Sequence, residues 1–183
     1  MTGSDGKPVA DAVVSLDPAS GQAPAPRMQG KYEVTQKDTM FHPFVTVVPI
    51  GATVSFPNLD PFRHHVYSFS PTKRFELKLF AKDQTRSITF DKAGIVAVGC
   101  NIHDSMSAFI YVTDSVWTVR TDASGNAVIR DVPAQAMKLT VWHPYLSAPG
   151  NQIAEMLPAS AADRARTMSI KLRPSPMNHM SSY

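Results

Sequence analysis

Residues 95–112 read Ile-Val-Ala-Val-Gly-Cys-Asn-Ile-His-Asp-Ser-Met-Ser-Ala-Phe-Ile-Tyr-Val, and this stretch contains the most informative pattern in the chain. Its first four and last four residues are of types that favour extended backbone, so we predict two strands with a short connection between them. Cys100, His103 and Met106 lie three residues apart in that connection. A thiol, an imidazole and a thioether can therefore converge on one point from a single loop.

An upstream segment, Asn58-Leu-Asp-Pro-Phe-Arg-His64-His65, brings one or two further imidazoles to the start of another predicted strand. Two imidazoles and a thiolate with a weak axial thioether form the ligand field of a blue-copper centre. Structural zinc usually takes several thiolates or two cysteines and two histidines, and a thioether suits it poorly. Met106 therefore favours one mononuclear copper ion over zinc. Either His64 or His65 could supply the first imidazole.

The composition excludes several other classes. The chain has 183 residues, of which 43% are apolar and 18% charged, enough to bury a core in one domain or two small ones. A net charge of +3 without a run of lysine or arginine gives no support for nucleic-acid binding. No apolar run approaches the roughly 18 residues of a membrane span, so we expect no transmembrane segment. A Cys100/His103 nucleophilic pair lacks any sign of an oriented base or oxyanion site, so we expect no enzyme.

Short apolar runs separated by turn residues predict an all-β sandwich or barrel across residues 31–113. These runs lie at residues 44–48, 54–56, 65–69, 75–80, 87–90, 95–98 and 109–112. A second, smaller β unit is predicted across residues 114–174, from runs at 117–120, 127–129, 138–142 and 168–172.

The ends of the chain complete the predicted domain organisation. Residues 1–30 read as one strand followed by a Pro- and Ala-rich linker over residues 17–29. We expect a short surface helix over residues 159–166 and a flexible tail over residues 175–183.

The loop Cys100-x2-His103-x2-Met106, preceded by Asn58, Asp60 and His64, resembles the cupredoxins, and its short form is most similar to the amicyanin type. The resemblance covers residues 39–112 and implies a Greek-key cupredoxin β-sandwich with a type 1 copper site. It implies His64, Cys100, His103 and Met106 as ligands, with Asn58 tying the ligand loops together. His65 stands where the family usually has asparagine or threonine, and this departure keeps His65 as the alternative first ligand.

Two further resemblances concern the rest of the chain. The strings 64–70 and 99–106 are similar to bacterial methylamine utilization proteins of cupredoxin type. Residues 6–16 and 121–144 resemble carboxypeptidase-regulatory-like β-sandwiches. The second resemblance implies that the N-terminal strand pairs with the C-terminal unit, so that the N- and C-terminal segments form a second small β-sandwich around the inserted copper domain.

The resemblance implies a blue-copper electron-transfer protein that shuttles single electrons between redox partners such as a c-type cytochrome or a dehydrogenase or oxidase. It also implies a periplasmic or secreted protein. Met1 is followed by no signal-like segment, so the chain is either cytoplasmic or begins after a removed leader. The alternatives are a copper-handling protein, for storage or delivery to a cuproenzyme, and a structural module that binds metal only for stability.

Surface expectations complete the prediction. An apolar patch where the metal-side histidine emerges could be formed by Phe41, Phe44, Phe62, Met106 and Ala108. A positive rim for partner docking, or simply a solvated strand face, could be formed by Arg63, Lys73, Arg74, Lys78, Lys82 and Arg86. We expect His42 and His143 to be structural histidines. We expect the tail that contains Met177, His179 and Met180 to be a solvated end and not a Cu(I)-binding segment.

Overall fold

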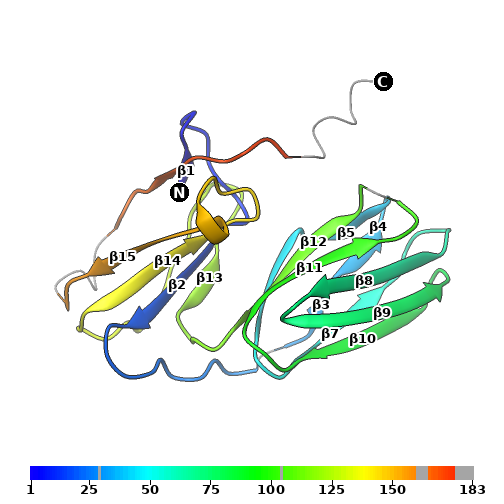
Figure 1. The fold of residues 1–183 in the computed structure, drawn as a ribbon, viewed down its shortest axis with the longest axis horizontal. Helices are drawn as coiled ribbons and strands as arrows, with labels where there is room; N and C mark the ends of the chain where they lie inside the picture. Colours follow the sequence, from blue (N-terminus) through cyan, green and yellow to red (C-terminus); the bar gives the residue numbers. More distant parts are fainter. Residues whose placement is uncertain (29, 104, 160–164, 176–183) are drawn as a thin grey trace. The chain divides into compact units, whose positions relative to one another are not determined.

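The computed structural model describes residues 1–28, 30–103, 105–159 and 165–175, and the chain divides into two compact units (Figure 1). Unit 2 runs from Ala25 to Asp114, and unit 1 combines Met1–Pro24 with Ser115–Tyr183. Every described element longer than three residues is a strand. The predicted all-β class is therefore confirmed.

Unit 2 consists of two sheets and a separate hairpin. The larger sheet has the order β6 (Val45–Pro49), β12 (Ser107–Thr113), β11 (Gly94–Cys100), β8 (His64–Ser70) and β9 (Lys73–Phe80). The smaller has the order β10 (Thr85–Phe90), β7 (Ala52–Pro57) and β3 (Tyr32–Glu33), and the hairpin joins β4 (Thr35–Lys37) to β5 (Met40–His42). Six of the seven predicted runs lie wholly in strands and the seventh, at residues 44–48, lies in β6 except for Phe44, whereas β3, β4 and β5 were not predicted.

Side chains of the larger sheet alternate between core and surface with a period of two, as a half-buried strand requires. Val96, Val98 and Cys100 face the core from β11, and His64 and Val66 face it from β8. Both sheets contribute to one apolar cluster that contains Cys100 and Met106. Two of the predicted ligands therefore belong to core-facing rows of neighbouring strands.

Unit 1 places an N-terminal strand inside a sheet of C-terminal strands. The order is β13 (Thr118–Arg120), β2 (Val13–Pro18), β14 (Met137–Trp142) and β15 (Gln152–Leu157), so that β2 pairs on both sides with strands of the later segment. A second small sheet pairs β1 (Thr2–Gly3) with β16 (Ser169–Ile170), and η1 (Pro149–Asn151) precedes β15.

The structure corrects three details of the predicted unit. Residues 127–129 form no strand although they favour one, and Val128 is largely exposed there. The strand β15 was missed, and only Ser169–Ile170 of the run at 168–172 is a strand. Most of the predicted helix, at residues 160–164, and the tail from residue 176 lie outside the described residues.

The described part of the chain contains no helix that is long and apolar enough to cross a membrane.

Acid is expected to destabilise unit 1 through His143. Burial lowers the pKa of this histidine to about 4, from an ordinary value near 6.5, and its Nδ1 accepts a hydrogen bond from the Tyr145 amide. Between these pH values His143 is protonated in the unfolded chain but not in the folded chain. The free energy of unfolding is therefore highest above pH 6.5 and decreases as the pH falls toward 4. The full loss is about 3 kcal/mol.

Both tryptophans, Trp117 and Trp142, belong to unit 1, so their fluorescence reports its unfolding selectively. Urea titrations at pH 7.5 and pH 4.5 should give a lower free energy of unfolding at the acidic pH, and His143→Asn should reduce that difference. An undiminished difference in the variant would assign the acid sensitivity to other groups.

Candidate metal centre

The first two predicted ligands are brought together by the pairing of β8 and β11. Cys100 lies opposite Val66, and Gly99 lies opposite Tyr67, whose ring packs directly against that glycine. The Asn101 amide donates to the His65 carbonyl at 3.2 Å and continues the pairing into the loop. His64 and Cys100 therefore sit on adjacent strands with their side chains in the same core-facing layer.

The loop after Cys100 folds back on itself and returns His103 to the same place. The Met106 amide donates to the His103 carbonyl at 3.0 Å, and the Cys100 amide donates to the Met106 carbonyl at 3.3 Å. The rings of His103 and His64 come within 5.1 Å between centroids. Two backbone hydrogen bonds thus fix the spacing of the three loop residues that the motif singled out.

The result is a compact cluster of one thiol and two imidazoles. Ligand atoms of His64, Cys100 and His103 all lie within 4.8 Å of one another, and the Cys100 Sγ lies 3.7 Å from the His64 Nδ1. His64 is 0% exposed and Cys100 3%. This arrangement fits a type 1 copper site and is compatible with one mononuclear copper ion.

The hydrogen bonding around the cluster also fits a metal. The Nδ1 of His103 is buried and has no hydrogen-bond partner among the described residues. Buried nitrogens without a partner are uncommon, because each loses its hydration without compensation. The Ile102 amide points toward the Cys100 Sγ at 3.5 Å, a weak donor of the kind that can tune a metal-bound sulfur.

Asp60 orients the buried imidazole, a role that the sequence analysis did not identify. Its Oδ2 accepts a hydrogen bond from His64 Nε2 at 2.7 Å, and both side chains are buried. Burial alone would raise the pKa of Asp60, but hydrogen bonds from His64 and from the amides of Thr39 and Asp38 lower it below the ordinary value. Because a carboxylate only accepts, this contact places a proton on the Nε2 of His64, and Nδ1 is the ring nitrogen that faces Cys100.

Asn58 closes the loop that carries Asp60. Its side-chain amide donates to the carbonyls of Phe62 and Phe80, and its Oδ1 accepts from the Asp60 amide at 2.9 Å. The side chain thus fixes the segment that leads into His64 and holds it against the end of β9.

Met106 lies at the end of the ligand loop and is 1% exposed. Its position continues the core-facing row of Ala108, Ile110 and Val112 on β12. The thioether therefore belongs to the same apolar cluster as Cys100.

His65 points away from the cluster. Its Nε2 lies 2.9 Å from the exposed Glu76 carboxylate, and its ring lies beside that of Tyr67 on the outer face of the sheet. His42 is exposed on β5, and His143 lies in unit 1. Met177, His179 and Met180 lie outside the described residues.

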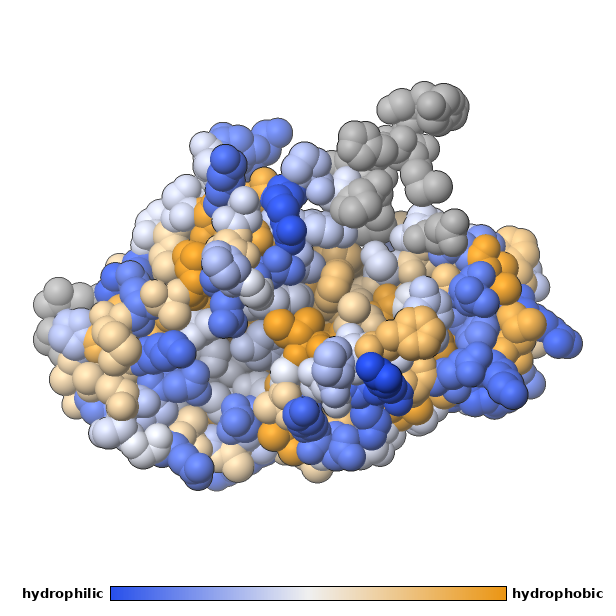
Figure 2. Space-filling view, viewed as in Figure 1, coloured by the Kyte–Doolittle hydropathy of each residue, from blue (hydrophilic) through white to orange (hydrophobic). Residues whose placement is uncertain are grey.

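The predicted apolar patch is wrong for three of its five members. Phe41, Met106 and Ala108 are buried, whereas Phe62 is 53% exposed with its ring 6.3 Å from the half-buried His103 ring. Leu59 and Ile102, which were not predicted, are about half exposed in the same two loops. In the view of Figure 2, hydrophobic residues of unit 2 are interspersed with hydrophilic ones.

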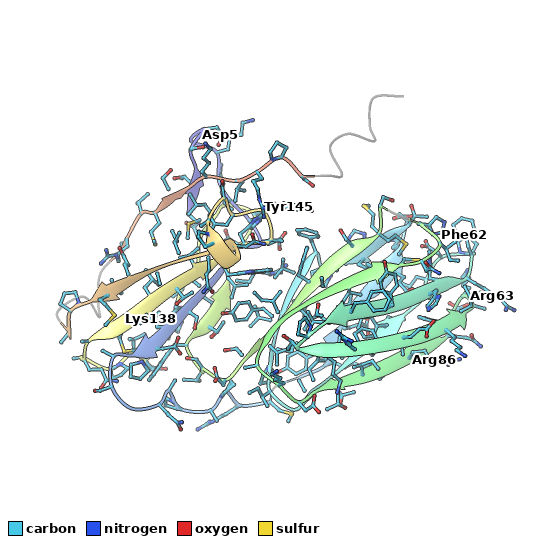
Figure 3. The ribbon with its side chains drawn as sticks, viewed as in Figure 1. Asp5, Phe62, Arg63, Arg86, Lys138 and Tyr145 are labelled. Atoms are coloured by element: carbon cyan, nitrogen blue, oxygen red, sulfur yellow. The ribbon has the colours of Figure 1, made fainter. Side chains whose placement is uncertain are left out.

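The basic residues that were predicted as a possible positive rim differ in their contacts. The Lys73 ammonium lies 2.9 Å from Asp91, and the Arg86 guanidinium lies over the Phe80 ring. Arg63 is exposed next to Phe62 at one end of unit 2 (Figure 3). Only Arg63 among these three is adjacent in sequence to His64.

Comparison with known proteins gives matches to solved structures alone: no protein-family model and no curated protein matches the chain. A Cu-containing nitrite reductase from Thermus scotoductus SA-01 is 25% identical, with a TM-score of 0.44 over 53% of this chain and 25% of that chain. A purple cupredoxin from Nitrosopumilus maritimus is 17% identical, with a TM-score of 0.41 over 45% of this chain and 100% of that chain.

A methionine-to-alanine mutant of amicyanin in the Cu(I) state is 23% identical, with a TM-score of 0.42 over 55% of this chain and 98% of that chain. The chain thus spans a quarter of the nitrite reductase and nearly all of the two small proteins.

Proposed function

We propose that unit 2 binds one copper ion through His64, Cys100, His103 and Met106, and that the protein carries single electrons between redox proteins without transforming a substrate. The observation that carries this proposal is the buried cluster of one thiol and two imidazoles, in which a buried imidazole nitrogen has no other partner. A bound copper ion would give that nitrogen a partner.

The donor set selects copper. Copper supplies a one-electron couple, in which sulfur donors favour Cu(I) and imidazoles serve both oxidation states. The chain's own contribution is to hold these donors in place and to exclude water. His64 and Cys100 are fixed by neighbouring strands and by the hydrogen bond from Asn101 to His65, so their positions need change little between the two states.

His103 is the ligand through which electrons would pass. It is half-buried, whereas His64 and Cys100 are almost fully buried. Leu59, Phe62 and Ile102 expose apolar surface in the adjoining loops. A small apolar edge of this kind suits the weak, short-lived contacts of redox partners.

For cellular context we propose a periplasmic or secreted protein whose partners are redox proteins such as a c-type cytochrome or a dehydrogenase or oxidase. The alternative is copper storage or delivery to a cuproenzyme. The burial of His64 and Cys100 supports retention of the ion and so favours electron transfer.

The deciding experiment loads the apoprotein with one equivalent of Cu(II) and records visible and EPR spectra through repeated cycles of ascorbate and ferricyanide. We expect an intense visible band that disappears on reduction and returns fully on oxidation. A Cu(I) chelator added to the reduced protein tests the alternative. Rapid loss of copper to the chelator, with poor recovery of the band, would favour copper handling over electron transfer.

Replacing the axial thioether is expected to raise the reduction potential and to keep the visible band. Met106→Leu replaces a polarisable, dipolar side chain beside the metal with a purely apolar one, which stabilises the more highly charged Cu(II) state less, and Leu conserves volume in a fully buried site. Spectroelectrochemical titration measures the potential. Met137→Leu, at a buried methionine of unit 1, is the matched control and should leave the potential unchanged. Equal potentials in both variants would remove Met106 from the ligand set.

A further inference from the structure

Among the described residues, Asp60 is a buried ionisable group that contacts the cluster and is not part of the proposed ligand set. Its carboxylate accepts three hydrogen bonds: from the Asp38 amide at 2.6 Å, from the Thr39 amide at 3.1 Å and from His64 Nε2 at 2.7 Å. The residue is 3% exposed. Three donors around a buried carboxylate favour its anionic form.

The surrounding backbone is shaped to make these contacts. Asp38 and Thr39 form the turn between β4 and β5, and both have φ of 55°, in the left-handed region that non-glycine residues rarely adopt. Their amides point at the same carboxylate. Asn58 fixes the other side of Asp60 by accepting from its amide. A strained turn and a buried amide side chain thus hold one carboxylate against one imidazole.

No lysine or arginine of the described residues forms an ion pair with this carboxylate. Among the ion pairs of the described residues, the only partner of Asp60 is His64. The negative charge therefore acts on whatever His64 binds, through a hydrogen bond in a site from which water is excluded.

We propose that Asp60 is a positioning residue that fixes His64 with Nδ1 free for the metal and, as a buried anion, stabilises Cu(II) relative to Cu(I). A carboxylate that accepts from one nitrogen of an imidazole makes the other nitrogen a stronger donor, and the more highly charged metal ion benefits more. The protein should accordingly have a lower potential than one with a neutral group at this position. This inference rests on the proposed copper site.

Asp60→Asn removes the charge and keeps the size of the side chain. We expect the copper-loaded variant to keep its visible band and to favour Cu(I) by about tenfold more than the unchanged protein, which for a one-electron couple is a rise of about 59 mV. Glu76→Gln is the matched control, because it removes a carboxylate that contacts the neighbouring His65 but is exposed to solvent. Its potential should change much less.

Asp60→Asn could fail to fold, because the asparagine side chain has one oxygen where the backbone amides of Asp38 and Thr39 need two. A second measurement therefore uses the unchanged protein. In the Cu(I)-loaded unchanged protein, nitrogen-15 NMR of the histidine rings should show His64 with a slowly exchanging proton on Nε2 and none on Nδ1. The opposite protonation would overturn the inference.

A potential in Asp60→Asn no higher than in Glu76→Gln would also overturn it. Either of these two results can be obtained while the visible band is intact. The proposed copper site would then be supported, and the proposed role of Asp60 would be wrong. Absence of the band in the unchanged protein would instead refute the proposed function.

Discussion

Cys100→Ser abolishes the intense visible absorption of the copper-loaded protein. The band requires charge transfer from a thiolate to copper, and a serine hydroxyl is neither soft nor ionised at neutral pH. Copper affinity should also fall, by more than the roughly 10–100-fold loss that follows removal of a ligand's hydrogen-bond partner. Visible spectroscopy and competition with a chelator measure the two effects.

Cys100 is the only cysteine, so the reactivity of the thiol gives an independent control. The apoprotein should react with one equivalent of a thiol reagent after unfolding, and copper should protect that thiol in the folded protein. Far-UV circular dichroism checks that the serine variant is folded. A folded Cys100→Ser protein that keeps the band would exclude this thiolate as the chromophore.

His64→Ala is expected to eliminate the type 1 spectrum, and His65→Ala to leave it unchanged. His64 is fully buried, with its Nδ1 3.7 Å from the Cys100 Sγ. His65 instead contacts Glu76 on the outer face. The two variants remove the same side chain from adjacent positions, so each is the other's control, and the measurement is the visible and EPR spectrum after addition of Cu(II).

Addition of free imidazole tests whether His64→Ala has lost only a metal ligand. Truncation of His64 leaves a buried space the size of the missing ring, so added imidazole should restore the band in His64→Ala if the variant lacks only a ligand. If His65→Ala loses the band and His64→Ala retains it, the first ligand is His65 and the assignment is displaced by one residue.

Much of the architecture follows from local sequence. The runs at residues 45–48, 95–98 and 109–112 are rich in Val, Ile and Phe, and each lies in a strand of the larger sheet. The short strand β3 and the hairpin of β4 and β5 were missed, because Thr35, Gln36 and Lys37 have no apolar alternation to reveal them. The strand β3 pairs with β7, which is distant in sequence, whereas β4 and β5 pair with each other.

The alternation along β12 explains part of the error in the predicted surface patch. Met106 and Ala108 share the parity of Ile110 and Val112, so a strict period of two would have placed them in the core. Phe41 could not be assigned in this way, since it is the only buried residue of a three-residue strand.

The role of Asp60 had no comparable signal in the sequence. A carboxylate between Asn58 and His64 reads equally well as a turn residue. Its hydrogen bonds come from the Asp38 and Thr39 amides, about twenty residues earlier in the chain, and these contacts exist only after the hairpin has folded against the loop.

By itself the sequence determined the all-β class and the spacing of Cys100, His103 and Met106, because strand propensity and loop length are local properties. Only the tertiary structure placed His64 in the cluster and His65 outside it. The alternation along β8 is ambiguous in the sequence. The outer row holds the aromatic residues Tyr67 and Phe69, whereas the inner row holds Val66 and the polar Ser68. The pairing with β11 decides which row faces the core, and it joins segments far apart in the chain. Asp60 is only four residues from His64, but its carboxylate is held by the amides of Asp38 and Thr39, which come from the earlier hairpin.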